Sequence, residues 1–197
     1  MSFDLQEIVP FGRSYTEYVA MFALEEADLS GRLLDCGGGP AAFNAELNRR
    51  GGAVVSADPL YGYEAEAIRA RIDEVVPEMM VQLERNRDKF RWDRSGSPEE
   101  LVALRQSAMD AFLADYPEGL REGRYVDAAL PELPFGKGRF DLVLVSHLLF
   151  LYSDHLDAAF HLRALQELAH LAGEVRVFPL ADLDGQPSRH LDPARRG

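Results

Sequence analysis

Short apolar segments that alternate with longer helical stretches constrain the fold of this chain more than any other feature. Five such segments have the length and residue types of strands: Arg32–Cys36, Ala53–Ala57, Arg124–Ala128, Phe140–Ser146 and Glu174–Phe178. Strands that alternate with helices predict βαβ units, because parallel strands must be joined by a long crossover. Phe140–Ser146 is apolar enough to be a central strand. The sequence therefore predicts an α/β fold with an open, mostly parallel, twisted sheet and helices on both faces.

Three helices are expected around these strands. Ser14–Asp28 has the pattern of an N-terminal helix, and Ala41–Arg50 of a helix between the first two strands. Ser153 is a candidate cap for a helix over Asp154–Ala172, which Gly173 would end, since Ser is favoured at helix starts and Gly just past helix ends.

The stretch of residues 64–118 is far longer than one crossover requires. It has two helical halves, Glu64 to about Phe90 and Pro98–Tyr116, with a break at Ser95-Gly96-Ser97-Pro98. We expect a helical insertion that either covers a pocket as a lid or lengthens the packing layer. The length of 197 residues suits one domain, so the insertion is assigned to a single domain over residues 1–197.

The charge balance argues against a nucleic-acid partner. The chain has 21 Lys and Arg residues against 33 Asp and Glu residues, a formal net charge of −12, whereas nucleic-acid binding needs a basic surface. Five basic residues do cluster in one stretch: Arg85, Arg87, Lys89, Arg91 and Arg94. Because Glu84, Asp88 and Asp93 interleave with them, the cluster predicts a solvated helix face.

Cysteine usage and hydropathy predict the compartment. The single cysteine, Cys36, excludes an internal disulfide and a cysteine-based zinc cluster, and fits a reducing cytoplasm. The N-terminus lacks the pattern of a signal peptide, and no apolar run approaches the roughly 18 residues of a membrane span. We therefore expect a soluble, cytoplasmic protein with no membrane partner.

A glycine-rich turn follows the first predicted strand. Gly37, Gly39 and Ala42 satisfy the loose dinucleotide-binding pattern G-x-G-x-x-G/A. Glycines between a strand and a helix let the backbone approach a ligand closely, because no Cβ intervenes. The match is weak alone, since an ordinary strand-to-helix turn can also contain three glycines.

Two carboxylates near this turn favour a cationic ligand. Asp58 follows the second strand, about twenty residues after the glycines, where a carboxylate can bind both ribose hydroxyls. Asp35 lies two residues before the first glycine, where it would repel a pyrophosphate by about 1–4 kcal/mol, and Pro40 removes one N–H that a phosphate would use. S-adenosylmethionine (SAM) has a sulfonium and an ammonium and no phosphate, so these residues favour SAM over NAD. The alternative for Asp35 is a carboxylate that only ties down the glycine turn.

The motifs resemble those of a known family. The stretch LLDCGGGPAAFNAEL, followed by VVSADPLY, resembles motifs I and II of the class I, Rossmann-like SAM-dependent methyltransferases, and YVDAALPELPFGKGRFDLVLVSHLLFLY resembles the rest of their core. The resemblance extends from about Phe11 to Phe178. It implies SAM as cofactor and transfer of a methyl group to an acceptor, which we expect to be a small molecule. The residues PFGRSYTEYVAMFAL and EVRVFPL further suggest a small bacterial branch of that family.

The resemblance also implies roles for single residues. Asp127, at the end of the third strand, would read the adenine amino group, and Ala128 would lie beside the ring. Pro59 belongs to the second motif beside Asp58. Ser146 and His147 occupy the place beside the methionine part of SAM.

The chain departs from the family at its C-terminal side. The family's sheet normally ends with two more strands after a fifth helix, and no strand pattern follows Phe178 here. We therefore expect strands 6 and 7 to be missing, either because the chain is truncated or because the sheet edge is made differently. This puts the acceptor pocket and catalytic activity in question. It also leaves a strand edge free to pair with a second copy in a homodimer.

Methyl transfer depends mainly on positioning, and a base is needed only if the acceptor must lose a proton. His147 is the best candidate base; the alternative is a histidine that is bonded to its loop and contacts SAM only by packing. Tyr15 and Tyr152 are candidates to line the acceptor pocket, or else belong to the core. Arg13 is a candidate partner for the SAM carboxylate, or else a surface arginine.

Other chemistries find less support. His155, His161 and His170 lack metal-ligand spacing, so no metal site is assigned. Ser146-His147 is not a nucleophile elbow, because G-x-S-x-G is missing. Two alternatives to a methyltransferase stay open: a SAM-binding sensor or assembly protein without transfer activity, and, with least support, an NAD-dependent oxidoreductase.

Overall fold

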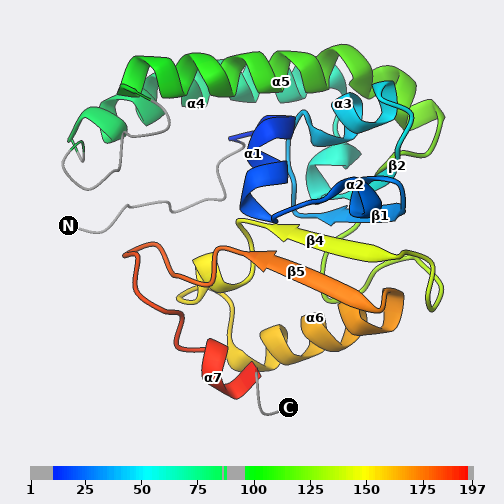
Figure 1. Cartoon of the computed structure of the whole chain (residues 1–197). Coiled ribbons are helices and arrows are strands. Elements are labelled where there is room, and N and C mark those ends of the chain that lie inside the picture. Colours follow the sequence, from blue (N-terminus) through cyan, green and yellow to red (C-terminus); the bar gives the residue numbers. More distant parts are fainter. Residues whose placement is uncertain (1–10, 86, 88–95, 195–197) are drawn as a thin grey trace.

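A five-stranded parallel sheet forms the centre of the molecule (Figure 1). The computed structural model describes residues 11–85, 87 and 96–194. In the order β3-β2-β1-β4-β5, the strands are Tyr125–Val126, Ala53–Ala57, Arg32–Cys36, Leu142–Ser146 and Glu174–Phe178. Every pair of neighbours is parallel, and the order matches the first five strands of the dinucleotide-binding sheet. The predicted α/β fold is confirmed, and the arrangement is consistent with a Rossmann-like fold.

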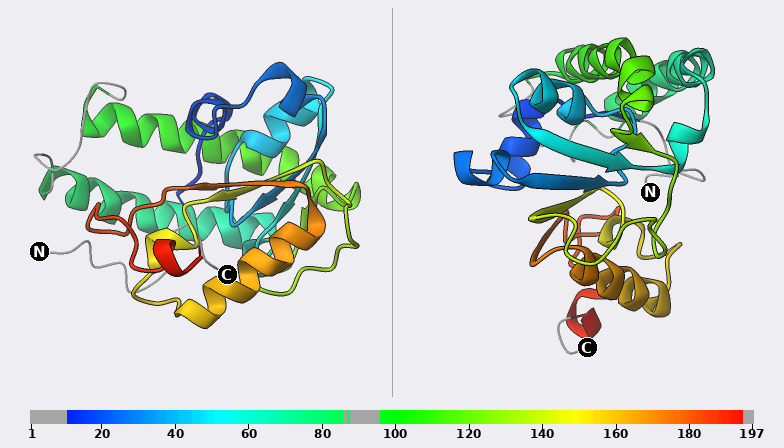
Figure 2. Two further views of the ribbon diagram at one scale, coloured as in Figure 1. Left: turned by 60° about the horizontal axis from the view of Figure 1, so that its bottom comes forward. Right: turned by 90° about the vertical axis from the view of Figure 1, so that its right-hand side faces the viewer.

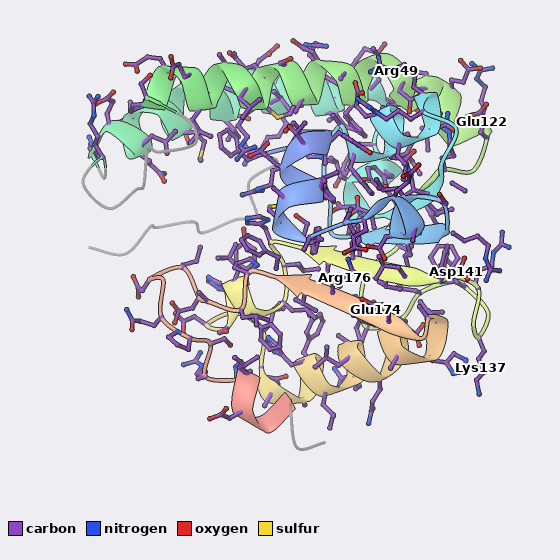
Figure 3. All side chains as sticks on the ribbon, viewed as in Figure 1. Arg49, Glu122, Lys137, Asp141, Glu174 and Arg176 are labelled. Atoms are coloured by element: carbon purple, nitrogen blue, oxygen red, sulfur yellow. The ribbon has the colours of Figure 1, made fainter. Side chains whose placement is uncertain are left out.

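The strand predictions are confirmed in position, with two shorter strands than expected. The predicted strand Arg124–Ala128 forms β3 only over Tyr125–Val126, and Phe140–Ser146 begins as β4 at Leu142. β4 lies between β1 and β5 and all five of its residues are buried, as expected for a central strand. Asp141, just before β4, forms an ion pair with Arg32 at the amino end of the sheet (Figure 3).

Helices and 3₁₀ turns surround the sheet. The described elements are α1 (Tyr15–Met21), α2 (Glu26–Leu29), α3 (Phe43–Arg49), η1 (Pro59–Gly62), α4 (Ala65–Arg85), α5 (Pro98–Arg121), η3 (Phe150–Tyr152), α6 (Ala158–Leu171) and α7 (Leu191–Ala194). In residues 179–194, an isolated bridge between Ala181 and Pro187 and helix α7 follow β5, and no further strand forms. Over the described residues, no helix is both long and apolar enough to cross a membrane.

The predicted continuous helix Ser14–Asp28 is wrong in its middle. α1 ends at Met21, Ala23 adopts a left-handed φ of 47°, and α2 begins only at Glu26. The break lets Leu24 join the same buried cluster as Phe22. In a continuous helix these two side chains would point to nearly opposite sides.

The predicted cap of the helix after β4 is also wrong. The Ser153 hydroxyl donates to the Phe150 carbonyl oxygen at 2.6 Å and contacts the Ser188 hydroxyl, so it does not cap a helix. Asp157 is the cap instead, since its Oδ1 accepts from the Phe160 N–H at 2.7 Å. α6 therefore begins four residues later than predicted, at Ala158.

The two faces of the sheet have separate hydrophobic cores, because side chains alternate along each strand. On one face, Leu33 and Leu144 pack with α1 and α3. On the other face, Leu34 and Val143 pack with α6. Figure 2 shows these helices on opposite sides of the sheet, so the prediction of helices on both faces is confirmed.

The insertion between β2 and β3 forms two long helices, α4 and α5, as predicted. They pack on each other through a buried cluster that includes Ile68, Met109 and Phe112. α5 continues to Arg121, five residues past its predicted end. The predicted end of the first half, near Phe90, and most of the predicted basic cluster lie outside the described residues.

Candidate functional site

The carboxyl ends of the strands open into a cavity of about 1080 Å³. Open α/β sheets bind their ligands at this edge. The structure brings eight of the predicted site residues to its wall: Arg13, Gly37, Gly39, Asp58, Pro59, Ala128, Ser146 and His147. Asp35 and Asp127 are not among the lining residues.

Hydrogen bonds hold the backbone of Gly39 at both its N–H and its carbonyl group. Its N–H donates to Asp58 Oδ2 at 3.0 Å, and its carbonyl oxygen accepts from the Tyr61 hydroxyl at 2.8 Å. Gly37 and Gly39 have φ values of 69° and 55°, in the left-handed region that favours glycine. No atom lies within 4 Å of the place where a Cβ of Gly39 would be. The turn is therefore fixed, and Gly39 leaves open space in front of its backbone.

Asp58 supports the glycine turn and also lines the cavity. Its Oδ1 accepts from the Leu60 N–H at 2.8 Å, which begins η1, while its Oδ2 accepts from Gly39. Burial raises the pKa of Asp58, and the nearby charge of Asp127 adds to this. Each carboxylate oxygen can accept a second hydrogen bond, so Asp58 can also accept from a ligand's hydroxyl groups.

Asp35 lies beneath the glycine turn. It is 1 % exposed, and its oxygens accept from the Tyr18 hydroxyl at 3.0 Å and the Ser56 hydroxyl at 3.2 Å. A Cβ on Gly38 would lie 2.2 Å from Asp35 Oδ2. Burial raises the pKa of Asp35 to about 7. This placement favours the interpretation that Asp35 ties down the turn, and direct contact with a ligand's cation stays a prediction.

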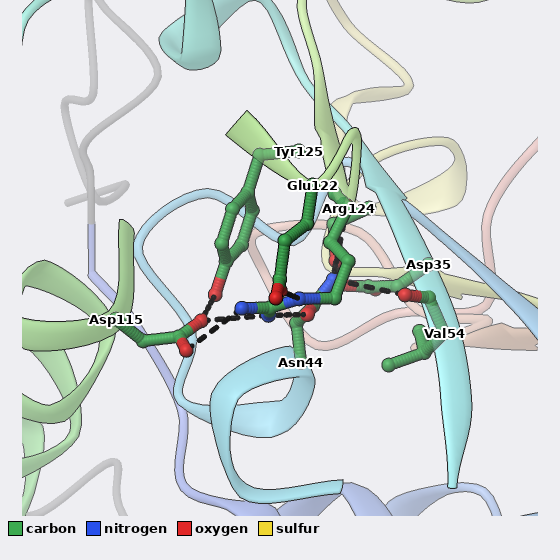
Figure 4. A network of polar contacts seen from close by, with 8 residues as sticks. Asp35, Asn44, Val54, Asp115, Glu122, Arg124 and Tyr125 are labelled. Atoms are coloured by element: carbon green, nitrogen blue, oxygen red, sulfur yellow. Dashed lines mark hydrogen bonds and ion pairs between the residues drawn. The ribbon is translucent and has the colours of Figure 1, made fainter. Parts of the chain in front are cut away.

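A buried polar network continues from Asp35 toward the inserted helices (Figure 4). The Ser56 hydroxyl accepts from Asn44 Nδ2 at 3.0 Å, and Asn44 Oδ1 accepts from Arg124 Nη1 at 2.7 Å. Arg124 then forms a bidentate pair with Asp115 of α5, at 2.7 and 2.9 Å. The network thus connects the strand beneath the glycine turn to α5.

Asp127 does not line the cavity, although its charge lies close enough to raise the pKa of Asp58. It is exposed, and its carboxylate lies beside Gly62, where a Cβ would be 2.7 Å from Asp127 Oδ2. Ala128, the next residue, does line the cavity. Recognition of adenine by Asp127 stays a prediction, and the position of its side chain outside the cavity lining gives it no support.

His147 is strained and electrically neutral. Its φ is 51°, its N–H donates to the Phe178 carbonyl oxygen at 2.6 Å, and its Nδ1 lies 3.0 Å from the Ser146 hydroxyl. Burial, with the charges of Arg13 and Arg105, lowers the pKa of His147 to about 2. A left-handed non-glycine residue is often found at functional sites. A histidine with this pKa is a weak base, so the geometry favours the packing interpretation over general-base catalysis.

Two arginines lie on the cavity wall near His147. Arg13 is half-buried, and its Nη1 donates to the Phe11 carbonyl oxygen at 3.2 Å. Arg105 of α5 is 7 % exposed and forms an ion pair with Glu17 of α1. Burial and the charge of Arg105 lower the pKa of Arg13 to about 10.

A comparison with known proteins finds a relative that spans nearly the whole chain. The two sequences are 32% identical over 190 residues, which cover 96% of this chain and 85% of the relative, the uncharacterised protein MJ0045 of Methanocaldococcus jannaschii. The chain belongs to the MJ0045 family. No protein-family model and no solved structure matches it. MJ0045 is archaeal, and the assignment of this chain to a bacterial branch stays a prediction.

In this member of the MJ0045 family, the two candidate pocket tyrosines have different places. Tyr152 lines the cavity. Tyr15 instead stacks on Phe43, with ring centroids 5.8 Å apart, and lies under the Arg50 guanidinium. Of the two, Tyr152 is therefore placed to contact a ligand, and Tyr15 belongs to the packing of α1 on α3.

Sequence reasoning missed Arg105 and Tyr61. Arg105 falls on the buried stripe of α5, together with Val102, Met109 and Phe112, where an apolar residue is expected. The sequence therefore did contain a signal for Arg105, namely a charged residue on a helix stripe that is otherwise apolar. Tyr61 gave no signal, because its bond to the glycine turn depends on tertiary contacts.

The residue types that bind metals and the single cysteine, Cys36, are the remaining candidates in this MJ0045 relative. Over the described residues, no three His, Cys, Asp or Glu side chains are placed to hold a metal ion. Cys36 is a buried free thiol, and burial raises its pKa well above the ordinary value. A thiol with a raised pKa is a poor nucleophile.

Proposed function

We propose that this protein is a class I, Rossmann-like SAM-dependent methyltransferase that acts on a small-molecule acceptor. One observation carries the proposal: the glycine turn after β1 and the carboxylate of Asp58 after β2 line the same cavity, joined by the Gly39–Asp58 hydrogen bond. The sequence motifs that resemble this family therefore come together at the edge of the sheet where ligands bind.

The residues of the cavity fit an adenosyl ligand. Gly39 offers open space next to the backbone, and Asp58 has unused acceptor positions for two ribose hydroxyls. Pro59 and Ala128 provide apolar surface for a flat ring. When bound, SAM supplies a methyl group on a positively charged sulfur.

The charges beside the turn favour a ligand without phosphate. Asp58 lines the cavity next to Gly39, and Asp35 lies directly beneath Gly38. A diphosphate on this turn would face the Asp58 carboxylate at short range, and it would find no N–H on Pro40. These contacts support SAM over NAD.

Calorimetric titration with SAM, S-adenosylhomocysteine (SAH) and NAD tests the proposal. We expect saturable binding of SAM and SAH and none of NAD. A well-folded sample that binds neither SAM nor SAH at millimolar concentration would reject the proposal. Tight binding of NAD instead would favour an oxidoreductase.

A second function is a SAM-binding sensor or assembly protein without transfer activity. The described residues after β5 favour it, because residues 179–194 form none of the further strands that the resemblance implies. Saturable SAM binding without turnover over a broad panel of acceptors would support this function. Detection of a methylated product by mass spectrometry would exclude it.

A further inference from the structure

The cavity is larger than one adenosyl ligand requires. Its volume of about 1080 Å³ lies at the upper end of the roughly 300–1,000 Å³ range of ligand pockets. Away from the strand ends its wall is largely apolar, and it includes Ile68, Met79, Leu83, Leu101, Leu151 and Leu156. The inserted helices and the segment after β4 thus enclose space for a second, apolar ligand.

Arg105 interrupts this apolar wall with a charged side chain. Its Nη1 pairs with Glu17, but its Nε–H is buried and has no hydrogen-bond partner. Buried donors without an acceptor are rare in folded proteins. This N–H is closed off from the open space, but the guanidinium to which it belongs lines the cavity, so Arg105 places a positive charge at the apolar wall.

The charges around Arg105 favour an anionic ligand. Arg13 lies close enough for the two guanidinium charges to influence each other. Glu17 is the carboxylate paired with Arg105, and over the described residues no ion pair joins Arg13 to a carboxylate. The two cations therefore share one anionic partner, which leaves an excess positive charge at the wall of an apolar cavity.

Gly12 helps to fix the position of Arg13. A Cβ on Gly12 would lie 2.0 Å from the Pro40 carbonyl oxygen, so the segment before α1 packs directly against the glycine turn. The Arg13 carbonyl oxygen also accepts from the Ala42 N–H at 2.9 Å. Arg13 is thus tied to the turn, while Arg105 comes from the inserted helix α5.

We propose that the acceptor is an apolar carboxylic acid, whose carboxylate binds Arg105 beside Arg13 and whose hydrocarbon part lies between α4, α5 and the segment after β4. This inference rests on the proposed function. In the reaction, a carboxylate oxygen forms the new C–O bond as the methyl–sulfur bond breaks, and the electron pair of that bond stays on sulfur. The products are a methyl ester and SAH. No proton is transferred, so the reaction needs no general base, in agreement with the neutral His147 at the end of β4.

The experiment measures binding of decanoic acid, methyl decanoate and decan-1-ol by calorimetry, in the presence of saturating SAH. We expect decanoate to bind at least tenfold more tightly than the ester or the alcohol. Equal binding of the three, or no binding of decanoate, would overturn the inference. This comparison uses the unaltered protein, so it does not depend on whether a variant folds.

Variants then test Arg105 itself. Arg105→Met should weaken decanoate binding at least tenfold and leave SAH binding unchanged, while Arg105→Lys, which keeps the charge opposite Glu17, should retain part of the affinity. The matched control is Arg69→Met on α4, which removes an exposed ion pair with Asp110 outside the cavity and should change neither. Unchanged decanoate binding by Arg105→Met would overturn the inference.

Two further results separate this inference from related possibilities. If Arg105 instead bound the carboxylate of the cofactor, Arg105→Met would weaken binding of SAH but not of 5′-methylthioadenosine, which lacks that carboxylate, and the inference would be overturned. Failure of the proposed function gives a different result, because SAH would not bind the unaltered protein. Decanoate binding, measured then without SAH, would still support the carboxylate site.

Discussion

The cavity has two regions with different physical origins. Its floor consists of the glycine turn, Asp58 and the Ser146-His147 pair, all at the ends of neighbouring strands. Its roof consists of the inserted helices α4 and α5. Hydrogen bonds fix the floor, among them the bond from Gly39 to Asp58, whereas apolar contacts such as those of Ile68 and Phe112 hold the roof together.

This difference teaches where specificity can arise. Residues of the floor are close in space because parallel strands end at one edge, so their arrangement follows from the order of the strands. The roof can change its lining residues without changing the sheet, because loops and insertions vary more freely than the elements they connect. We therefore assign recognition of the cofactor to the floor and recognition of the acceptor to the roof.

The largest effect on stability is expected where the two regions join. Arg124→Met removes the bidentate partner of Asp115 and the donor to the buried Asn44 Oδ1, and leaves the Asp115 charge with the Tyr125 hydroxyl in place of an arginine. Breaking a buried charged pair on one side costs about 3–5 kcal/mol, which urea unfolding would measure. Arg121→Met, at the exposed end of α5, is the control and should cost less than about 1 kcal/mol. Equal effects of the two variants would show that floor and roof are not joined through this network.

The second largest effect is expected in the pH dependence of stability. Burial raises the pKa of Asp35 from the ordinary value of 3.8 for an aspartate to about 7 in the folded protein. The folded state therefore keeps a proton that the unfolded chain releases, so stability falls as the pH rises from about 4 to about 7 and levels off above that. The change is up to about 4 kcal/mol, at 1.36 kcal/mol per unit of pKa.

Asp35→Asn separates this effect from other titrations. Asn keeps the shape of the side chain and has no proton to release, so its free energy of unfolding should lack this decrease between pH 5 and pH 7. Urea unfolding of both proteins at several pH values measures the difference. Parallel curves for the two proteins would contradict the raised pKa of Asp35.

A smaller effect is expected for Gly37→Ala in the floor. A left-handed alanine costs roughly 1–2 kcal/mol, and the new Cβ would lie 2.8 Å from Leu148 Cδ2, so we expect a loss of about 2–3 kcal/mol. Gly185→Ala is the matched control, because its φ of 75° is similar but no atom lies within 4 Å. Thermal or urea unfolding measures both. A larger loss for Gly185→Ala would refute the close packing of the floor.

The smallest effect is expected on the outer side of the roof. Arg69 of α4 and Asp110 of α5 form an exposed ion pair at 2.9 Å. Exposed pairs contribute about 0–1 kcal/mol, so Arg69→Met should lower the free energy of unfolding by less than about 1 kcal/mol. A loss above about 2 kcal/mol would mean that ion pairs, and not apolar contacts, hold the roof together.

The sequence predicted the floor better than the roof for a physical reason. Strands such as Arg32–Cys36 and Ala53–Ala57 were placed correctly, because most of their residues are buried and their segments are therefore largely apolar. The glycines and Asp58 have fixed places relative to such strands. By contrast, Arg105 meets Glu17 and the cavity only through packing of helices that are distant along the chain, and the turn at Ala23 depends on the burial of Leu24.

Calorimetric measurement of SAH affinity in three proteins tests the central claim most directly: the unaltered chain, Asp58→Ala and Asp141→Ala. Asp141 is an exposed aspartate at the opposite end of the sheet, so its loss should leave the affinity unchanged. Our account predicts that the unaltered protein binds SAH and that Asp58→Ala weakens this binding at least tenfold, because hydrogen bonds to a charged group contribute about 1.5–3 kcal/mol. Equal affinities of Asp58→Ala and the unaltered protein, or no binding by any of the three, would contradict it.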